Sequence, residues 1–208
     1  MRPVVAREKA ARMDPGWMQS VAMCIVEIPY LLVSGVLSAL VFYSLTGLSG
    51  DAEHIVLYFL AHTLLGFLLA YLSHFVSYVF ATADIATLAA SSIVSLMFLF
   101  GGVFVPGPGM PPGWKWIWTI NFLRHTLPTM IVPQFYCEAP ANATDTCETI
   151  FFATANGAVE LRTSDYVQDF MGVNYDTRWE SLFGLVGYTV GFVICTILAA
   201  RYINHVKR

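Results

Sequence analysis

Four residues of this 208-residue chain suggest metal binding or proton transfer by their types and positions: His54, His62, His74 and Asp84. Two metal ligands share one face of a helix when they lie three or four residues apart. His62 and His74 lie too far apart for this arrangement. We therefore expect these histidines to hydrogen-bond between helices, with no metal bound.

Three common sequence signatures of catalysis are absent from the chain. It has no G-x-x-x-x-G-K-[ST] phosphate loop, no G-x-S-x-G turn and no H-E-x-x-H motif. Nucleic-acid binding is excluded as well, because 11 Lys and Arg against 14 Asp and Glu give a net charge of −3 and no basic stripe. We predict no catalytic residue and no cofactor bound by this chain itself.

Two cysteines flank a glycosylation signal. Cys137 and Cys147 lie on either side of the sequon that begins at Asn142. In an oxidising compartment the two thiols can close a disulfide loop, which stabilises a fold by about 3 kcal/mol in the chain-entropy model. The alternative is a pair of free thiols.

The elements that must position all these residues are membrane helices. Hydrophobic residues make up 57 % of the chain and charged residues 12 %, with a mean hydropathy of +0.63. A soluble domain carries about 25 % charged residues. Because this chain has too little charge to cover a water-facing surface, we predict an integral, multi-pass membrane protein.

Four apolar runs, at residues 21–45, 55–80, 85–105 and 182–200, are long enough to cross a bilayer as helices. The fold class predicted is therefore an all-α membrane protein with four transmembrane helices. Basic residues precede the first run and follow the last one. The positive-inside rule then places both termini in the cytoplasm and residues 106–179 outside.

A fifth apolar stretch, residues 113–135, is interrupted by polar residues and prolines. Arg124 and His125 would be costly at mid-depth in a membrane, and Pro128 and Pro133 each remove a backbone donor. We interpret this stretch as a re-entrant or interfacial helical hairpin on the outer side. Its tryptophans would then lie at the level of the lipid headgroups.

An acidic residue and a proline stand close together in the first run. Glu27 is costly within a membrane helix unless it is paired, and Pro29 is expected to kink the helix. One interpretation is a hinge with a buried anchor. The other is that Glu27 extends to the inner interface.

The order of several motifs resembles one known family. Arg7-Glu8-Lys9-Ala10 is followed by E-I-P-Y at residues 27–30, by G-G-x-F-x-P at 101–106, by W-x-W, and by the cysteine loop. This order resembles the C-terminal part of the ABC-2 type membrane domain of G-subfamily ABC transporters, the white and pleiotropic drug resistance proteins.

The resemblance implies a division of the chain and a role for each part. Residues 1–20 are similar to a cytoplasmic coupling-helix segment, 21–105 hold three transmembrane helices, 106–179 the extracellular hairpin and cysteine loop, and 180–208 the last transmembrane helix and tail. The implied site residues are Arg7, Glu8, Lys9 and Arg12 for coupling, Glu27, Pro29 and Tyr30 for the hinge and anchor, Ser95, Leu96, Leu99, Phe100, Val103 and Phe104 for the substrate cavity and plug, Cys137 and Cys147 for a disulfide, and Asn142 for glycosylation.

The function implied by the resemblance is ATP-driven export of hydrophobic substrates such as drugs, lipids or sterols, at the plasma membrane. The partners implied are a nucleotide-binding domain, which holds ATP and Mg²⁺, a second transmembrane domain, membrane lipid and the substrate. A complete unit of the family has six spans, so we expect this chain to be a piece of a longer transporter that does not pump alone. The alternatives are a truncated structural or regulatory subunit and, from the residues, an intramembrane enzyme using His62, His74 and Asp84.

Overall fold

The structure is a computed structural model that describes residues 16–48, 51–102, 104–137, 149–154, 157–172 and 174–203. Its elements in chain order are α2 (Gly16–Thr46), α3 (Ala52–Val79), α4 (Ala83–Leu99), η1 (Pro112–Trp114), α5 (Lys115–Ile120), α6 (Leu123–Phe135), β1 (Thr149–Thr154), β2 (Gly157–Arg162), α7 (Thr163–Met171), η2 (Tyr175–Thr177) and α8 (Arg178–Tyr202). Most of the described chain is therefore helical, as the composition predicts.

Three helical segments of the described chain are long and apolar enough to cross a membrane: Trp17–Thr46, Ala52–Val79 and Tyr175–Tyr202. They contain most of the first, second and fourth apolar runs. α2 already includes Gly16, which lies before the start expected at residue 21.

The third predicted span is shorter than expected. α4 has 17 residues and ends at Leu99, whereas the apolar run continues to residue 105. Gly101 and Gly102 follow, and Gly102 has a φ of +104°, which ends the helical path. The structure therefore supports three long spans and one shorter apolar helix, and the predicted count of four is not confirmed.

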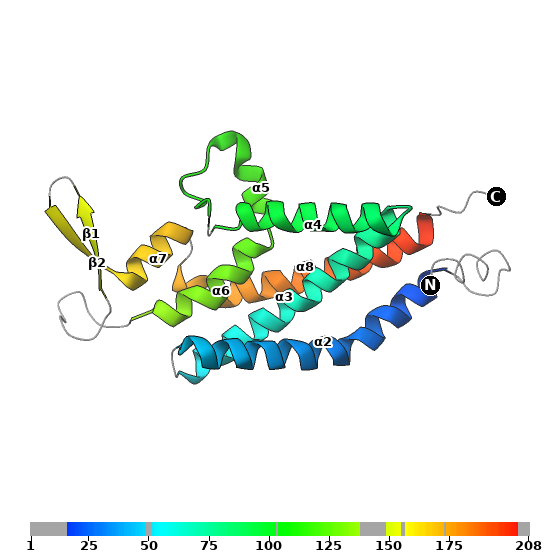
Figure 1. The fold of residues 1–208 in the computed structure, drawn as a ribbon, viewed down its shortest axis with the longest axis horizontal. Helices are drawn as coiled ribbons and strands as arrows, with labels where there is room; N and C mark the ends of the chain where they lie inside the picture. The colour runs from blue at the N-terminus through cyan, green and yellow to red at the C-terminus, as the bar shows by residue number, and fades with distance from the viewer. Residues whose placement is uncertain are drawn as a thin grey trace.

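α3 is the central helix of the molecule and packs against α2, α4, α6 and α8 (Figure 1). The core brings together Leu57 and Leu68 of α3, Leu123 of α6 and Leu185 of α8, all fully buried. In contrast, most of the apolar side chains of α2 face outward. Such an apolar outer surface is typical of a helix that contacts lipid or another membrane helix.

Helix α2 changes direction partway along its length (Figure 1). It contains one internal proline, Pro29, which lacks the N–H that would bond the carbonyl one turn earlier. The bend agrees with the kink expected from the sequence.

The region predicted as a helical hairpin consists of short helices. η1 and α5 lead into Asn121 and Phe122, and α6 then packs against α3 and α8. Pro128 and Pro133 lie inside α6. This stretch is therefore helical in short pieces, and its re-entrant or interfacial position on the outer side stays a prediction.

The all-α prediction missed a β-hairpin. β1 pairs with β2 in antiparallel register from Thr149↔Arg162 to Thr154↔Gly157, and α7 follows directly. The sequence carries the signal in Asn156-Gly157 between two segments that contain β-branched and aromatic residues. In Figure 1 this hairpin and α7 lie at one end of the molecule, while the start of α2 and the end of α8 lie at the other.

Candidate functional site: a polar node between three helices

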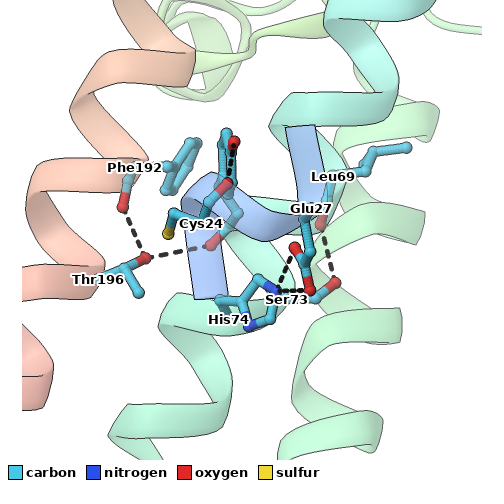
Figure 2. Close-up of polar contacts among 8 residues, drawn as sticks. Cys24, Glu27, Leu69, Ser73, His74, Phe192 and Thr196 are labelled. Atoms are coloured by element: carbon cyan, nitrogen blue, oxygen red, sulfur yellow. Dashed lines mark hydrogen bonds and ion pairs between the residues drawn. The ribbon is translucent and has the colours of Figure 1, made fainter. Parts of the chain in front are cut away.

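The acidic residue of α2 is paired with a histidine of α3. Nε2 of His74 lies 2.9 Å from Oε1 and 2.8 Å from Oε2 of Glu27. The two side chains are only 28 % and 32 % exposed. Figure 2 shows the carboxylate directed at the imidazole across the gap between the helices. The structure therefore supplies the partner that a carboxylate at this position requires.

Three further hydrogen bonds lie near this pair (Figure 2): one joins α3 to α2, one joins α8 to α3, and one lies within α8. The hydroxyl of Tyr71 donates to the carbonyl of Cys24 at 3.3 Å. Oγ1 of Thr196 lies 3.3 Å from the carbonyl of Tyr71 and 2.7 Å from that of Phe192. We call Cys24, Glu27, Tyr71, His74 and Thr196 the polar node, since they link α2, α3 and α8.

The sequence spacing explains why the polar node forms. Cys24 and Glu27 are three residues apart on α2, and Tyr71 and His74 are three apart on α3. Residues at this spacing lie on the same face of a helix. When the helices pack, these two faces meet: the side chains of Glu27 and His74 pair, and the Tyr71 hydroxyl reaches the backbone carbonyl of Cys24. Thr196 of α8 completes the node through the backbone carbonyl of Tyr71.

All three histidines of α3 contact another element, which confirms the expectation that they hydrogen-bond between helices. His62 Nε2 lies 2.9 Å from Oγ of Ser38 on α2, and His54 Nε2 lies 3.4 Å from the hydroxyl of Tyr175. Among the described residues, no group of three His, Cys, Asp or Glu side chains could hold a metal ion.

The turn between α5 and α6 is held by one buried amide. Asn121 is completely buried; its Nδ2 donates to the carbonyl of Met97 at 2.6 Å, and its Oδ1 accepts from the backbone N–H of Leu123 at 3.0 Å. The hydroxyl of Tyr188 on α8 donates to the carbonyl of Ile120 at 3.2 Å. These bonds attach the turn to α4 and α8.

A pocket lies beside the end of α4. Ser95, Leu99 and Phe104, together with Val94 and Phe98, line a volume of about 320 Å³. The residues of α4 repeat at helical spacing along one face, and Phe104 reaches the same pocket from beyond the helix end. Apart from Ser95, the side chains that line the pocket are apolar.

The comparison with known families decides the identity of the chain. Residues 1–135 match the family model described as ABC-2 type transporter. The chain belongs to the ABC-2 type transporter family. It is an integral membrane protein of the kind that, in ABC transporters, works with nucleotide-binding domains.

The full length of this ABC-2 chain is similar to curated G-family ABC transporters. It is 26 % identical over 214 residues to ABC transporter G family member 3 of Dictyostelium discoideum, covering 100 % of this chain and 15 % of that protein. It is 27 % identical over 209 residues to ABC transporter G family member 35 of Arabidopsis thaliana (100 % and 14 %). It is 26 % identical over 207 residues to pleiotropic drug resistance protein TUR2 of Spirodela polyrhiza (100 % and 13 %). The chain therefore spans about one seventh of the length of these relatives, and the predicted resemblance is confirmed.

The structure of this ABC-2 domain brings together only part of the residue set that the resemblance implied. Ser95, Leu99 and Phe104 share the pocket. Phe100 instead stacks on Trp114, with ring centroids 5.9 Å apart, and Leu96 is exposed outside the pocket lining. Phe100 turns away because it follows the last residue of α4 and no longer continues the helical face.

Some of the remaining residues implied by the resemblance lie in the described part of the chain, and others lie outside it. Pro29 and Tyr30 lie in α2, where both are exposed. Cys137 is disulfide-bonded, while Cys24 and Cys195 are free. Seven implied positions lie outside the described residues: Arg7, Glu8, Lys9, Arg12, Val103, Asn142 and Cys147.

Tyr71 and Thr196 were not predicted from residue spacing, and no partner was predicted for Glu27. The sequence signal that could have found them is a polar residue within an otherwise apolar helix. Such a residue needs a hydrogen-bond partner when it is buried. The identity of those partners depends on which helices pack together, and the residues near each position do not determine that packing.

Proposed function

We propose that this chain is part of the membrane domain of an ATP-driven exporter that moves hydrophobic substrates, such as drugs, lipids or sterols, across a membrane. The observation that carries the proposal is the match of residues 1–135 to the ABC-2 type transporter family. Because the sequence has no phosphate loop, ATP and Mg²⁺ are held by a partner nucleotide-binding domain. A second transmembrane domain completes the translocation path.

The proposed topology has four spans in the plasma membrane, with both termini in the cytoplasm. α4 reaches the lower limit of about 17 residues for a spanning helix. The start of α2 and the end of α8 lie together, opposite the β-hairpin and α7 (Figure 1). This arrangement supports an extracellular position for residues 106–179, including Asn142 and a Cys137–Cys147 disulfide.

The proposed mechanism passes movement from the cytoplasmic segment into the bundle. Arg7, Glu8, Lys9 and Arg12 precede α2 and contact the nucleotide-binding domain. α2 carries their displacement to Glu27, whose pairing with His74 connects α2 to α3. Pro29 supplies a hinge directly after this contact. The carboxylate thus acts as an anchor between two moving helices.

The coupling step is tested by Arg7→Ala and Glu8→Ala in the full-length transporter. We expect each change to reduce substrate-stimulated ATP hydrolysis by at least about fivefold, since coupling between distant sites is typically worth about 1–3 kcal/mol. The measurement is the ratio of stimulated to basal ATPase activity in proteoliposomes. Arg208→Ala, in the other tail, is the control. A ratio unchanged from wild type contradicts the coupling role.

We propose that the pocket lined by Ser95, Leu99 and Phe104 binds part of the substrate. Phe104 is 69 % exposed, so Phe104→Ala removes little packing. We expect it to raise the KM for efflux of a hydrophobic dye about tenfold, because a buried aromatic contact contributes about 1.5 kcal/mol or more. Phe183→Ala, at an equally exposed phenylalanine on α8 (72 %), is the control. Efflux that falls only in proportion to surface expression contradicts the role.

A further inference from the structure

Arg124, at the start of α6, carries a positive charge that the described residues do not neutralise. Its Cζ lies 3.7 Å from the centroid of the Trp118 ring. The side chain is half-buried. Within the described ranges, the guanidinium has neither an ion pair nor a hydrogen bond to an acceptor. A guanidinium has five N–H donors, so this group is prepared to bind an anion.

The segment around Arg124 contains no acidic residue that could serve as this anion. Residues 106–137 include no Asp or Glu, and Lys115 is the other basic residue there. Burial lowers the pKa of the adjacent His125, and the charge of Arg124 lowers it further, so this imidazole is neutral at neutral pH. Burial lowers the pKa of the Arg124 guanidinium, and Tyr188 of α8 raises it in part. The local charge is therefore positive.

The aromatic surroundings indicate what kind of anion is nearby. Trp114 and Trp116 are exposed on η1 and α5, and exposed tryptophans gather at the headgroup level of a bilayer. The stack on Trp118 places the guanidinium beside this group of rings. Arginine binds phosphate in a bidentate manner, with more geometric specificity than lysine.

The platform under Arg124 is tightly packed. Gly107 lies so close to Trp118 that a Cβ at this glycine would be 2.3 Å from Cε2 of the ring. On the other side, Asn121 fixes the turn that leads into α6. The Trp118 ring and the guanidinium on it are therefore held before any ligand arrives, which reduces the entropy lost on binding.

We propose that Arg124, stacked on Trp118, binds the phosphodiester group of a phospholipid, whose acyl chains lie along the exposed apolar surface of α5. The proposal rests on the membrane location included in the proposed function. The bound lipid supplies the counter-charge that a cation in the membrane requires. Lys115 adds to the attraction for the same headgroup.

The test is a lipid titration of the full-length transporter in detergent, read by native mass spectrometry. The probes are phosphatidylglycerol and a diacylglycerol with the same acyl chains but no phosphate. We expect wild type to bind phosphatidylglycerol in preference and Arg124→Gln to weaken the first bound lipid about tenfold. Arg124→Lys should have an intermediate affinity, because it keeps the positive charge but loses the bidentate contact. Arg201→Gln is the matched control, because Arg201 also stacks on an aromatic ring, at 5.5 Å from Tyr202, but lies at the other end of the bundle.

Three outcomes overturn the proposal: equal affinity of wild type and Arg124→Gln, equal binding of diacylglycerol and phosphatidylglycerol by wild type, or displacement of the lipid by millimolar inorganic phosphate. Should Arg124→Gln fail to fold, the preference between the two lipids in wild type and Arg124→Lys decides the question. The readout needs neither ATP nor transport. A transporter that binds the lipid through Arg124 but shows no ATP-driven flux would refute the proposed function alone.

Discussion

Replacing His74 with alanine is expected to lower the free energy of unfolding by about 2–3 kcal/mol, because Glu27 would keep a carboxylate in a largely buried position without its partner. This loss lies in the lower part of the range of destabilisation caused by removing one partner of a buried ion pair, because both side chains are partly exposed. The measurement is thermal unfolding of the purified protein in detergent.

A double variant measures the interaction between Glu27 and His74 separately from the contacts that each residue makes with its other neighbours. Glu27→Gln combined with His74→Ala is expected to be less destabilising than the sum of the two single changes, because no unpaired charge remains. Ser73→Ala is the control: it is adjacent to His74, and its hydroxyl donates to the carbonyl of Leu69 in the same helix at 2.8 Å (Figure 2). Additive effects of the two single changes would show that Glu27 and His74 do not interact.

The second large effect is expected at the turn between α5 and α6. Asn121→Ala removes both hydrogen bonds of a completely buried amide and leaves the carbonyl of Met97 and the N–H of Leu123 without this partner. Each unsatisfied buried group costs about 1–3 kcal/mol, so we expect a loss of about 2–5 kcal/mol in the free energy of unfolding.

Thermal unfolding and limited proteolysis of the turn measure this effect. Thr119→Ala is the matched control, since its exposed hydroxyl donates only to the carbonyl of Lys115 within α5 at 2.9 Å; we expect it to change stability by less than about 0.5 kcal/mol. A loss for Asn121→Ala as small as that of the control would mean that the turn is held by packing alone.

The sequence predicted the long helices because their apolar runs are continuous and sufficiently long. It failed at the end of α4, where hydropathy stays high through residue 105 but Gly101 and Gly102 end the helix. Composition reports whether a segment suits lipid; backbone geometry decides where a helix stops. The β-hairpin was missed for the opposite reason, because its signal is short and is easily outweighed by a strongly helical chain.

The candidate site was predictable to the extent that it depends on local spacing. The need of Glu27 for a partner follows from its position in an apolar helix. That His74 is this partner follows only from the packing of α2 on α3, across 47 positions in the chain. Likewise, Ser95 and Leu99 share a helical face, but Phe104 reaches their pocket by a loop path that helical periodicity does not describe.

The most direct test of the account is ATP-dependent transport by the full-length protein in inside-out membrane vesicles. The probes are a lipophilic fluorescent dye, a phospholipid with a fluorescent acyl chain and a fluorescent sterol. We expect wild type to accumulate at least one probe with ATP but not with a non-hydrolysable ATP analogue, and His74→Ala to accumulate less of it per ATP hydrolysed. ATP hydrolysis by a correctly inserted transporter without accumulation of any probe would contradict the account.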